Sequence, residues 1–294
     1  MMEPQDAPND SVGVIGLGLL GTALAERLVA AGYDVRVHNR SREKAEPLIA
    51  VGARWSDNPL ADCPRVVISL YTTDIVEQVL AALDVTSHPG VLLLDTTTGD
   101  PVRTPALGQR LADAGVDYLE VPISGSSEQT RRGEATALVA GPPEAAARCR
   151  DLLTALVLRH FNVGGWGNGV RMKLVTNLVL GLNRAALAEG LAFASSIGLT
   201  MDAALEVLMN CPAYSRTMDA KGPKMAAGDF APQAKLSQHL KDVRIIIDQG
   251  RRAGQELPMS HLHCELLERA ERQGWGELDN SVIIRAIDSQ NAKS

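Results

Sequence analysis

A glycine-rich turn between two apolar segments constrains the fold of this chain more than any other part of its sequence. Residues 12–15 are apolar, residues 16–21 follow with the spacing GxGxxG, and apolar residues then recur at helical spacing as far as Ala31. A second apolar run covers residues 33–37. The order strand, glycine turn, helix and strand within about 30 residues is the context in which this spacing indicates dinucleotide binding.

Each glycine of this turn has a separate physical task. Gly16 permits a tight turn, Gly18 removes a β-carbon that would hold a pyrophosphate off the backbone, and Gly21 lets the helix approach the sheet closely. The helix N-terminus then offers free N–H groups to phosphates. A purely structural turn is the alternative. The context favours a cofactor site that consists of Gly16, Leu17, Gly18, Leu19, Leu20 and Gly21.

The end of the second predicted strand indicates which dinucleotide binds. NAD is usually recognised by an acidic residue about 20 positions after the glycines. This strand instead ends in Asn39, Arg40, Ser41 and Arg42, and two guanidinium groups with a hydroxyl suit the 2′-phosphate of NADP. A solvated basic turn is the alternative interpretation. We therefore expect NADP as the cofactor, and some use of NAD stays open.

Predicted strands and helices alternate through the first half of the chain. Buried strands are predicted at residues 65–70, 91–95 and 117–121, and helices at residues 41–51, 75–83 and 104–114. This alternation is typical of α/β proteins with a doubly wound parallel sheet, in which ligands bind beyond the carboxyl ends of the strands. The loops expected to carry function therefore begin at Gly16, Leu70, Thr96 and Pro122.

The sequence pattern changes at the glycine-rich segment 164–169. Helical patterns continue from there, starting with a helix predicted over residues 169–197 that is apolar on more than one side. We expect a loose tail at residues 1–10, a dinucleotide-binding domain at 11–163 and an all-helical domain at 164–294. A helical domain of this kind needs a partner subunit to cover it, so we expect a homodimer or homotetramer.

Composition argues against several classes of function. The formal net charge of -6 and an aromatic content of 3% argue against nucleic acid as a partner. No apolar run approaches the roughly 20 residues that span a bilayer, and the N-terminal residues carry no signal-peptide core. The four cysteines are far apart and lack CxxC spacing, which is typical of reduced thiols. We therefore expect a soluble cytoplasmic protein without a membrane partner.

No metal site is expected from the sequence. His261 and His263 are close in the chain, but residues i and i+2 of a helix face different directions. The two histidines are therefore unsuited to holding one ion together.

Hydroxyl groups follow the strand predicted at residues 117–121. Ser124, Gly125 and Ser126 can form a turn that presents N–H and O–H donors to an anion such as a substrate carboxylate. A serine-rich surface turn explains these residues equally well when they are taken alone. Their position at the ligand edge of the sheet favours the carboxylate, so the expected substrate is a small molecule that bears one.

Lys173 lies at the start of the long predicted helix. Asn177 is four residues further on, so the two side chains share a helix face. An exposed lysine whose alkyl chain covers apolar surface is the alternative. The expected position at the seam between the domains favours an acid/base, because burial lowers the pKa of a lysine toward neutral pH.

With these motifs in this order, the chain resembles the β-hydroxyacid dehydrogenases. This family includes 3-hydroxyisobutyrate dehydrogenase, tartronate semialdehyde reductase and the glyoxylate/succinic semialdehyde reductases, and the last branch is the most similar. The resemblance extends over residues 12–287. It implies a Rossmann domain followed by a helical domain. It also implies hydride transfer with NADP between a small β-hydroxyacid and its semialdehyde or keto form.

The resemblance assigns roles to individual residues. It implies that Lys173 is the catalytic acid/base and that Asn177 orients the substrate. Cofactor contacts beyond the glycine turn are expected at Asn39, Arg40, Ser41, Leu70, Thr98 and Lys241. Substrate contacts are expected at Ser124, Gly125, Ser126, Thr97, Phe230 and Ala234.

One position departs from the reductase branch. Ala234 stands where that branch has a phenylalanine, although Phe230 lies four residues earlier, so the substrate stays open. Two alternatives remain. A non-catalytic nucleotide-binding module would need neither Lys173 nor Asn177, and an imine reductase that uses NADPH has a similar architecture but lacks the lysine.

Overall fold

The structure is a computed structural model that describes residues 11–287, and the chain divides into two compact units. Unit 1 is Met1–Lys173 and unit 2 is Leu174–Ser294. The division thus falls inside the long helix near the middle of the chain, whereas the sequence places it at the preceding glycine-rich segment, between residues 163 and 164. The reason is that the first turns of this helix pack on the sheet of unit 1.

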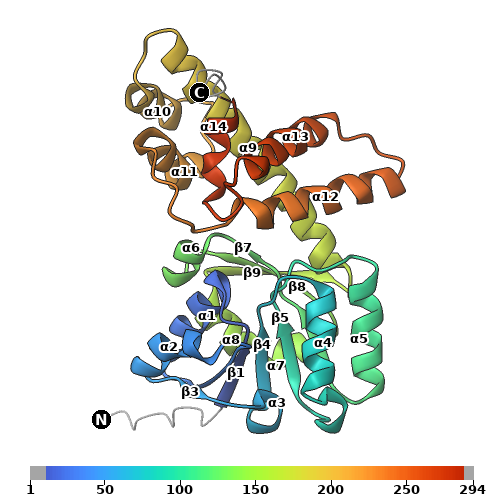
Figure 1. The fold of residues 1–294 in the computed structure, drawn as a ribbon. Helices are drawn as coiled ribbons and strands as arrows, with labels where there is room; N and C mark the ends of the chain where they lie inside the picture. Colours follow the sequence, from blue (N-terminus) through green and yellow to red (C-terminus); the bar gives the residue numbers. More distant parts are fainter. Residues whose placement is uncertain (1–10, 288–294) are drawn as a thin grey trace. The chain divides into compact units, whose positions relative to one another are not determined.

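Within the described residues, unit 1 is built around a nine-stranded sheet (Figure 1). Its strands are β1 (Ser11–Ile15), β2 (Asp34–His38), β3 (Arg54–Trp55), β4 (Arg65–Ile68), β5 (Leu92–Asp95), β6 (Asp117–Glu120), β7 (Ile123–Ser124), β8 (Thr136–Ala140) and β9 (Arg159–Gly164). The order along the sheet is β3-β2-β1-β4-β5-β6-β8-β7, and β9 pairs with β8. Strands β1 to β6 pair in parallel, which confirms the predicted doubly wound sheet.

The far end of the sheet differs from the sequence prediction. Strand β8 runs antiparallel to β6 and β7 and parallel to β9, so the sheet is mixed and not wholly parallel. The strands β7, β8 and β9 and the short β3 are not predicted from the sequence. Strand β7 has two residues, and β9 is exposed at most positions and carries Arg159, His160 and Asn162. Both lack the buried apolar run by which a strand is identified.

Helices cover both faces of the sheet (Figure 1). The helices of unit 1 are α1 (Leu19–Ala30), α2 (Glu46–Ala50), α3 (Pro59–Asp62), α4 (Thr73–Ala82), α5 (Arg103–Asp113), α6 (Ser127–Arg131), α7 (Pro143–Arg148) and α8 (Arg150–Leu156), with 3-10 turns at Arg42–Ala45 and Val85–Ser87. The helices predicted at residues 75–83 and 104–114 are confirmed as α4 and α5.

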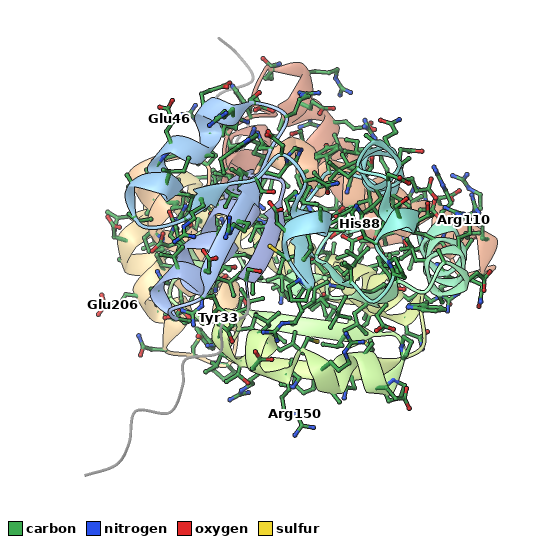
Figure 2. All side chains as sticks on the ribbon, turned by 90° about the horizontal axis from the view of Figure 1, so that it is seen from below. Tyr33, Glu46, His88, Arg110, Arg150 and Glu206 are labelled. Atoms are coloured by element: carbon green, nitrogen blue, oxygen red, sulfur yellow. The ribbon has the colours of Figure 1, made fainter. Side chains whose placement is uncertain are left out.

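The two faces of the sheet have separate hydrophobic cores. Val67 of β4 packs with Leu24 of α1 and Leu152 of α8, whereas its neighbour Val66 packs with Leu80 of α4 and Leu111 of α5. This follows from the alternation of side chains along a strand. The outer sides of the helices are charged, and Figure 2 shows Arg110 and Arg150 pointing away from the sheet.

Unit 2 consists of helices in the described residues, which confirms the predicted helical domain. They are α9 (Asn168–Ser196, which begins in unit 1), α10 (Met201–Met209), α11 (Arg216–Ala227), α12 (Leu236–Arg252), α13 (Pro258–Arg272) and α14 (Ile283–Ile287), with a 3-10 turn, η3, at Asn280–Val282. The long helix predicted over residues 169–197 is confirmed as α9. Its second half contributes to one core cluster with α12 and α13 through Leu187, Leu191, Leu240, Val243 and Leu267.

By length and composition, α9 is also apolar enough to cross a membrane, a property that the sequence analysis did not identify. The helix contains the buried charged residues Lys173 and Arg184, and Leu187, Ala188 and Leu191 contribute to the core of unit 2. A helix packed in a protein core passes the same test. Its buried charged residues and its place in the core cluster fit that explanation for part of the helix, since 33% of its apolar window is buried.

The carboxylate of Glu120 fixes the start of α9. Glu120 is the last residue of β6, and its side chain is 1% exposed. It accepts hydrogen bonds from the backbone N–H of Gly167 and, at 2.9 Å, from that of Val170. Burial raises the pKa of Glu120, while these two backbone donors oppose the rise. A carboxylate at the positive end of a helix stabilises the helix, and here it joins the sheet to α9.

We predict that Glu120→Ala destabilises the protein by about 2 kcal/mol, because two buried N–H groups lose their acceptor. The free energy of unfolding in urea measures this loss. The matched control is Glu128→Ala on α6, whose side chain is 40% exposed and should cost less than about 1 kcal/mol. Equal effects of the two substitutions would contradict the role of Glu120.

Candidate functional site

The predicted cofactor turn joins β1 to α1 at the carboxyl end of β1. Gly16 has a φ of +95°, and a β-carbon there would lie 2.3 Å from the carbonyl oxygen of Ser69. A β-carbon on Gly21 would lie 1.9 Å from the carbonyl oxygen of Gly16. Neither position therefore accepts a side chain.

Gly18 differs from the other two glycines because it faces open space. It precedes α1 without a side-chain cap, and a β-carbon at Gly18 would have no neighbour within 4 Å. The first N–H groups of α1 are thus approachable, as the binding of a pyrophosphate requires. The backbone of this turn fits a dinucleotide.

Asn39 connects the end of β2 to the glycine turn. Its Oδ1 accepts a hydrogen bond from the backbone N–H of Leu17 at 3.0 Å, and its Nδ2 donates to the carbonyl of Ser41 at 3.0 Å. Gly16 also donates from its backbone N–H to the carbonyl of His38 at 2.9 Å. Asn39 therefore holds two predicted cofactor segments together.

The basic residues after β2 lie beside an aromatic ring that the sequence analysis did not single out. Arg40 and Arg42 are exposed, and the guanidinium carbon of Arg42 lies 5.2 Å from the ring centre of Trp55 on β3. His38 stacks on the same ring with a centroid distance of 5.4 Å. Because a cation over an indole ring is attracted to it, Trp55 restrains the position of Arg42.

The loops after β4 and β5 are tied to each other. The backbone N–H of Leu70 donates to Oγ1 of Thr97 at 3.2 Å, and the N–H of Thr97 donates to Asp95 at 2.9 Å. Asp95 also accepts from the hydroxyl of Tyr118 at 2.8 Å, and burial raises the pKa of Asp95. Thr98 follows and is 9% exposed. These predicted cofactor and substrate residues share the carboxyl edge of the sheet.

Ser124 ends the short strand β7, and Gly125 and Ser126 lead from it into α6. Ser126 caps that helix: its hydroxyl accepts from the N–H of Gln129 at 3.2 Å, and its own N–H donates to the side chain of Gln129 at 2.9 Å. The pattern S-x-x-Q is a sequence signal for such a capping box, and the sequence analysis did not use it. Ser126 therefore has a structural role, and Ser124 and Gly125 are the more accessible members of the loop.

Lys173 is the last residue of unit 1 and is 7% exposed. It lies on α9 close to the helix start that Glu120 fixes. Since Asn177 is four residues further on and 8% exposed, the two residues predicted to be catalytic occupy one buried face of α9. This is not the arrangement of a lysine at the surface.

In unit 2, the carboxylate of Asp242 on α12 joins two predicted site residues. Asn177 donates to Oδ2 of Asp242 at 2.8 Å, and the ammonium of Lys241 lies 3.2 Å from Oδ1. Asp242 is 4% exposed. Because Asp242 accepts this hydrogen bond, it fixes the orientation of the Asn177 side-chain amide. The spacing of these residues in the sequence does not reveal the contact.

The last two predicted substrate residues differ in their surroundings. Phe230 is 7% exposed and packs in the core of unit 2, where the guanidinium of Arg285 lies 4.6 Å from its ring centre. Ala234 is half-buried, and its backbone N–H donates to Asp279 at 3.0 Å. Within residues 11–287, no group of three or more potential metal ligands lies together.

Known proteins match almost all of the described chain. Residues 11–164 match the family model of the NAD binding domain of 6-phosphogluconate dehydrogenase, which is more than half of the chain. Residues 167–287 match the model for the NAD-binding region of NADP-dependent 3-hydroxyisobutyrate dehydrogenase.

Individual proteins are similar over nearly the same length. Chloroplastic glyoxylate/succinic semialdehyde reductase 2 of Arabidopsis thaliana is 28% identical, with 96% of this chain and 81% of the relative covered. The structure of Psf3 in complex with NADP+ and 2-OPP has a TM-score of 0.85 at 29% identity and covers 94% of this chain and 99% of that one. A 3-hydroxyisobutyrate dehydrogenase of Salmonella typhimurium shares the fold, with a TM-score of 0.86 at 23% identity over 94% of this chain and 99% of that one.

Proposed function

We propose that this chain uses NADP to interconvert a small β-hydroxyacid and its semialdehyde or keto form. The chain belongs to the β-hydroxyacid dehydrogenase family and is an NAD(P)-dependent dehydrogenase that acts on CH–OH groups. The observation that carries the proposal is the buried position of Lys173 on the helix face that it shares with Asn177. A nucleotide-binding module has no use for a buried ammonium group there.

The cofactor part of the proposal rests on the β1–α1 turn and the end of β2. The open backbone at Gly18 would hold the pyrophosphate, and Arg40, Ser41 and Arg42 would bind the 2′-phosphate of NADP. No acidic residue stands among residues 39–42 to favour the ribose hydroxyls of NAD. When bound, NADPH supplies the hydride.

The chain's own residues would position the substrate and move the proton. Ser124 and the N–H of Gly125 would bind the substrate carboxylate, and Asn177, oriented by Asp242, would hold the reacting oxygen. Alignment of this kind is worth up to about 7 to 11 kcal/mol. Lys173 would donate a proton to the developing alkoxide oxygen and would accept it back in the oxidative direction.

We also propose that the protein is a cytoplasmic homo-oligomer. The long helix α9 exposes large apolar side chains, among them Val175, Val179 and Phe193, which are 57%, 51% and 63% exposed. Exposed apolar side chains along one helix are typical of a surface that another subunit covers. Light scattering is expected to give the mass of a dimer or tetramer, and a monomer at micromolar concentration would contradict this part of the proposal.

The replacement Lys173→Ala is expected to lower kcat by roughly 10²- to 10⁴-fold and to leave the affinity for NADPH unchanged, because a proton donor is lost and no cofactor contact is. The measurement is the absorbance of reduced nicotinamide with a panel of short hydroxyacids and their semialdehydes. Arg171→Ala, two residues earlier on an exposed part of α9, is the control and should keep its activity. Full turnover by Lys173→Ala would exclude the lysine as the acid/base.

The same panel separates the alternative functions. An imine reductase would reduce an added ketimine and leave the hydroxyacids unchanged. A nucleotide-binding module would bind NADPH without transferring a hydride to any compound. Oxidation of at least one hydroxyacid is the result expected here.

The replacements Arg42→Ala and Trp55→Ala are expected to weaken the binding of 2′,5′-ADP by at least about tenfold, because a charged hydrogen bond to phosphate is lost or loosened. Binding of AMP, which lacks the 2′-phosphate, should not change. Calorimetry measures both. The control is Arg54→Ala on β3, whose side chain is 65% exposed and projects from the opposite face to Trp55. An equal loss of affinity for AMP would mean that the turn itself was damaged.

A further inference from the structure

Arg184 of α9 is a buried cation that the proposed reaction does not use. Its side chain is 5% exposed, and among residues 11–287 its Nε and Nη1 atoms have no hydrogen-bond partner. It lies about two helical turns after Asn177 on the same face of α9, since a turn takes about 3.6 residues. Burying guanidinium N–H groups without hydrogen-bond acceptors is costly, so an acceptor for these groups is expected.

Asp279 is the carboxylate whose charge acts on Arg184, but its oxygens are already occupied. Oδ1 accepts from Lys221 at 2.8 Å and from the N–H and hydroxyl of Ser281 at 3.1 and 2.8 Å. Oδ2 accepts from Lys221 at 2.9 Å and from the backbone N–H groups of Gln233 and Ala234, both at 3.0 Å. Three donors on each oxygen leave no place for Arg184.

The surroundings of Arg184 therefore carry an excess of positive charge. Burial lowers the pKa of Arg184 to about 10, so this group is a cation at neutral pH. Burial also lowers the pKa of Lys221, while Asp279, whose carboxylate pairs with the Lys221 ammonium at 2.8 Å, opposes the shift. Burial and the charge of Arg184 lower the pKa of His263 to about 4, so this histidine is neutral. Two buried cations thus share the single carboxylate of Asp279.

A further hydroxyl donor lies close to this excess charge. Thr217 is one helical turn before Lys221 on α11, so the two side chains share a face. Its Oγ1 is buried, and it has no hydrogen-bond partner among residues 11–287. A guanidinium and a hydroxyl that both lack partners match the needs of an anion with several oxygen atoms.

We propose that Arg184 binds an oxyanion, a carboxylate or a phosphonate or phosphate group, and that during the reaction this group is a second acid group of the substrate. The inference rests on the proposed function for the reacting end of the substrate. The guanidinium of an arginine binds such groups through two parallel N–H···O hydrogen bonds, which the ammonium group of a lysine does not form. The preferred substrates are then β-hydroxyacids with two acid groups.

Ala234 supports an organic ligand at this position. Its backbone N–H donates to the same Asp279 that acts on Arg184, and its side chain is a single methyl group on a half-buried residue. A methyl group at the residue bonded to Asp279 takes up less volume than an aromatic ring would. Asn177, which would orient the reacting oxygen, is on the same face of α9 as Arg184.

The first experiment measures anion binding without catalysis. Thermal unfolding of the full chain is followed at constant ionic strength with inorganic phosphate or glutarate. Both anions are expected to stabilise the wild type in a saturable way, and Arg184→Met should weaken this binding by at least about tenfold. Arg184→Lys keeps the positive charge and loses the paired N–H donors of the guanidinium, so its affinity for the anion should lie between those of the wild type and Arg184→Met. Arg251→Met on α12, whose side chain is 74% exposed, is the control and should behave as the wild type.

The second experiment asks whether the anion belongs to the substrate. 2-(Hydroxymethyl)glutarate and 2-(hydroxymethyl)pentanoate have the same reacting end and differ in a terminal carboxylate or methyl group. The wild type is expected to prefer the diacid by about a hundredfold in kcat/KM, and Arg184→Met should remove this preference.

The outcomes distinguish the inference from the proposed function. Stabilisation by phosphate with equal turnover of the two compounds would show a site for a free anion and would overturn the substrate assignment. If neither probe distinguishes the wild type from Arg184→Met, water alone solvates the guanidinium and the site does not exist. If neither compound is oxidised with either coenzyme, the proposed function fails, and phosphate binding still decides the anion site.

Discussion

The hydrogen bonds from the start of α9 to the carboxylate of Glu120 fix where that helix begins. Glu120 ends β6, so a single buried side chain fixes where the helix begins relative to the carboxyl edge of the sheet. The register of α9 then determines which residues share its buried face. Lys173, Asn177 and Arg184 do so because their spacing is close to whole helical turns. Lys173, which we propose as the acid/base, lies close to this anchored helix start.

Backbone geometry, and not side-chain chemistry, makes the other part of the site. The contact between Gly21 and the carbonyl of Gly16 leaves no room for a β-carbon, and Asn39 ties this turn to the end of β2. The residues that would distinguish NADP from NAD are therefore attached to the turn that would hold the pyrophosphate. Trp55 adds a restraint on Arg42 from a neighbouring strand.

Two buried carboxylates organise the polar groups of unit 2 in different ways. Asp242 accepts from Asn177, which the family resemblance assigns to catalysis, and pairs with Lys241, which it assigns to the cofactor. The oxygens of Asp279 accept from Lys221, Ser281 and two backbone N–H groups. The charge of Asp279 acts on Arg184, but its oxygens accept no hydrogen bond from Nε or Nη1 of the guanidinium. The anion that we propose at Arg184 would supply the hydrogen-bond acceptor that Asp279 does not.

The sequence by itself determined the glycine turn, the parallel strands β1, β2, β4, β5 and β6 and the helix α9, because local periodicity and the special backbone of glycine are readable without contacts. It did not determine the strands β7 to β9, which lack a buried apolar run, or the capping role of Ser126. Tertiary structure alone decided the partners of Glu120, Asp242 and Trp55 and the isolation of Arg184. These features depend on which residues far apart in the sequence come into contact, and no local pattern along the chain predicts such contacts.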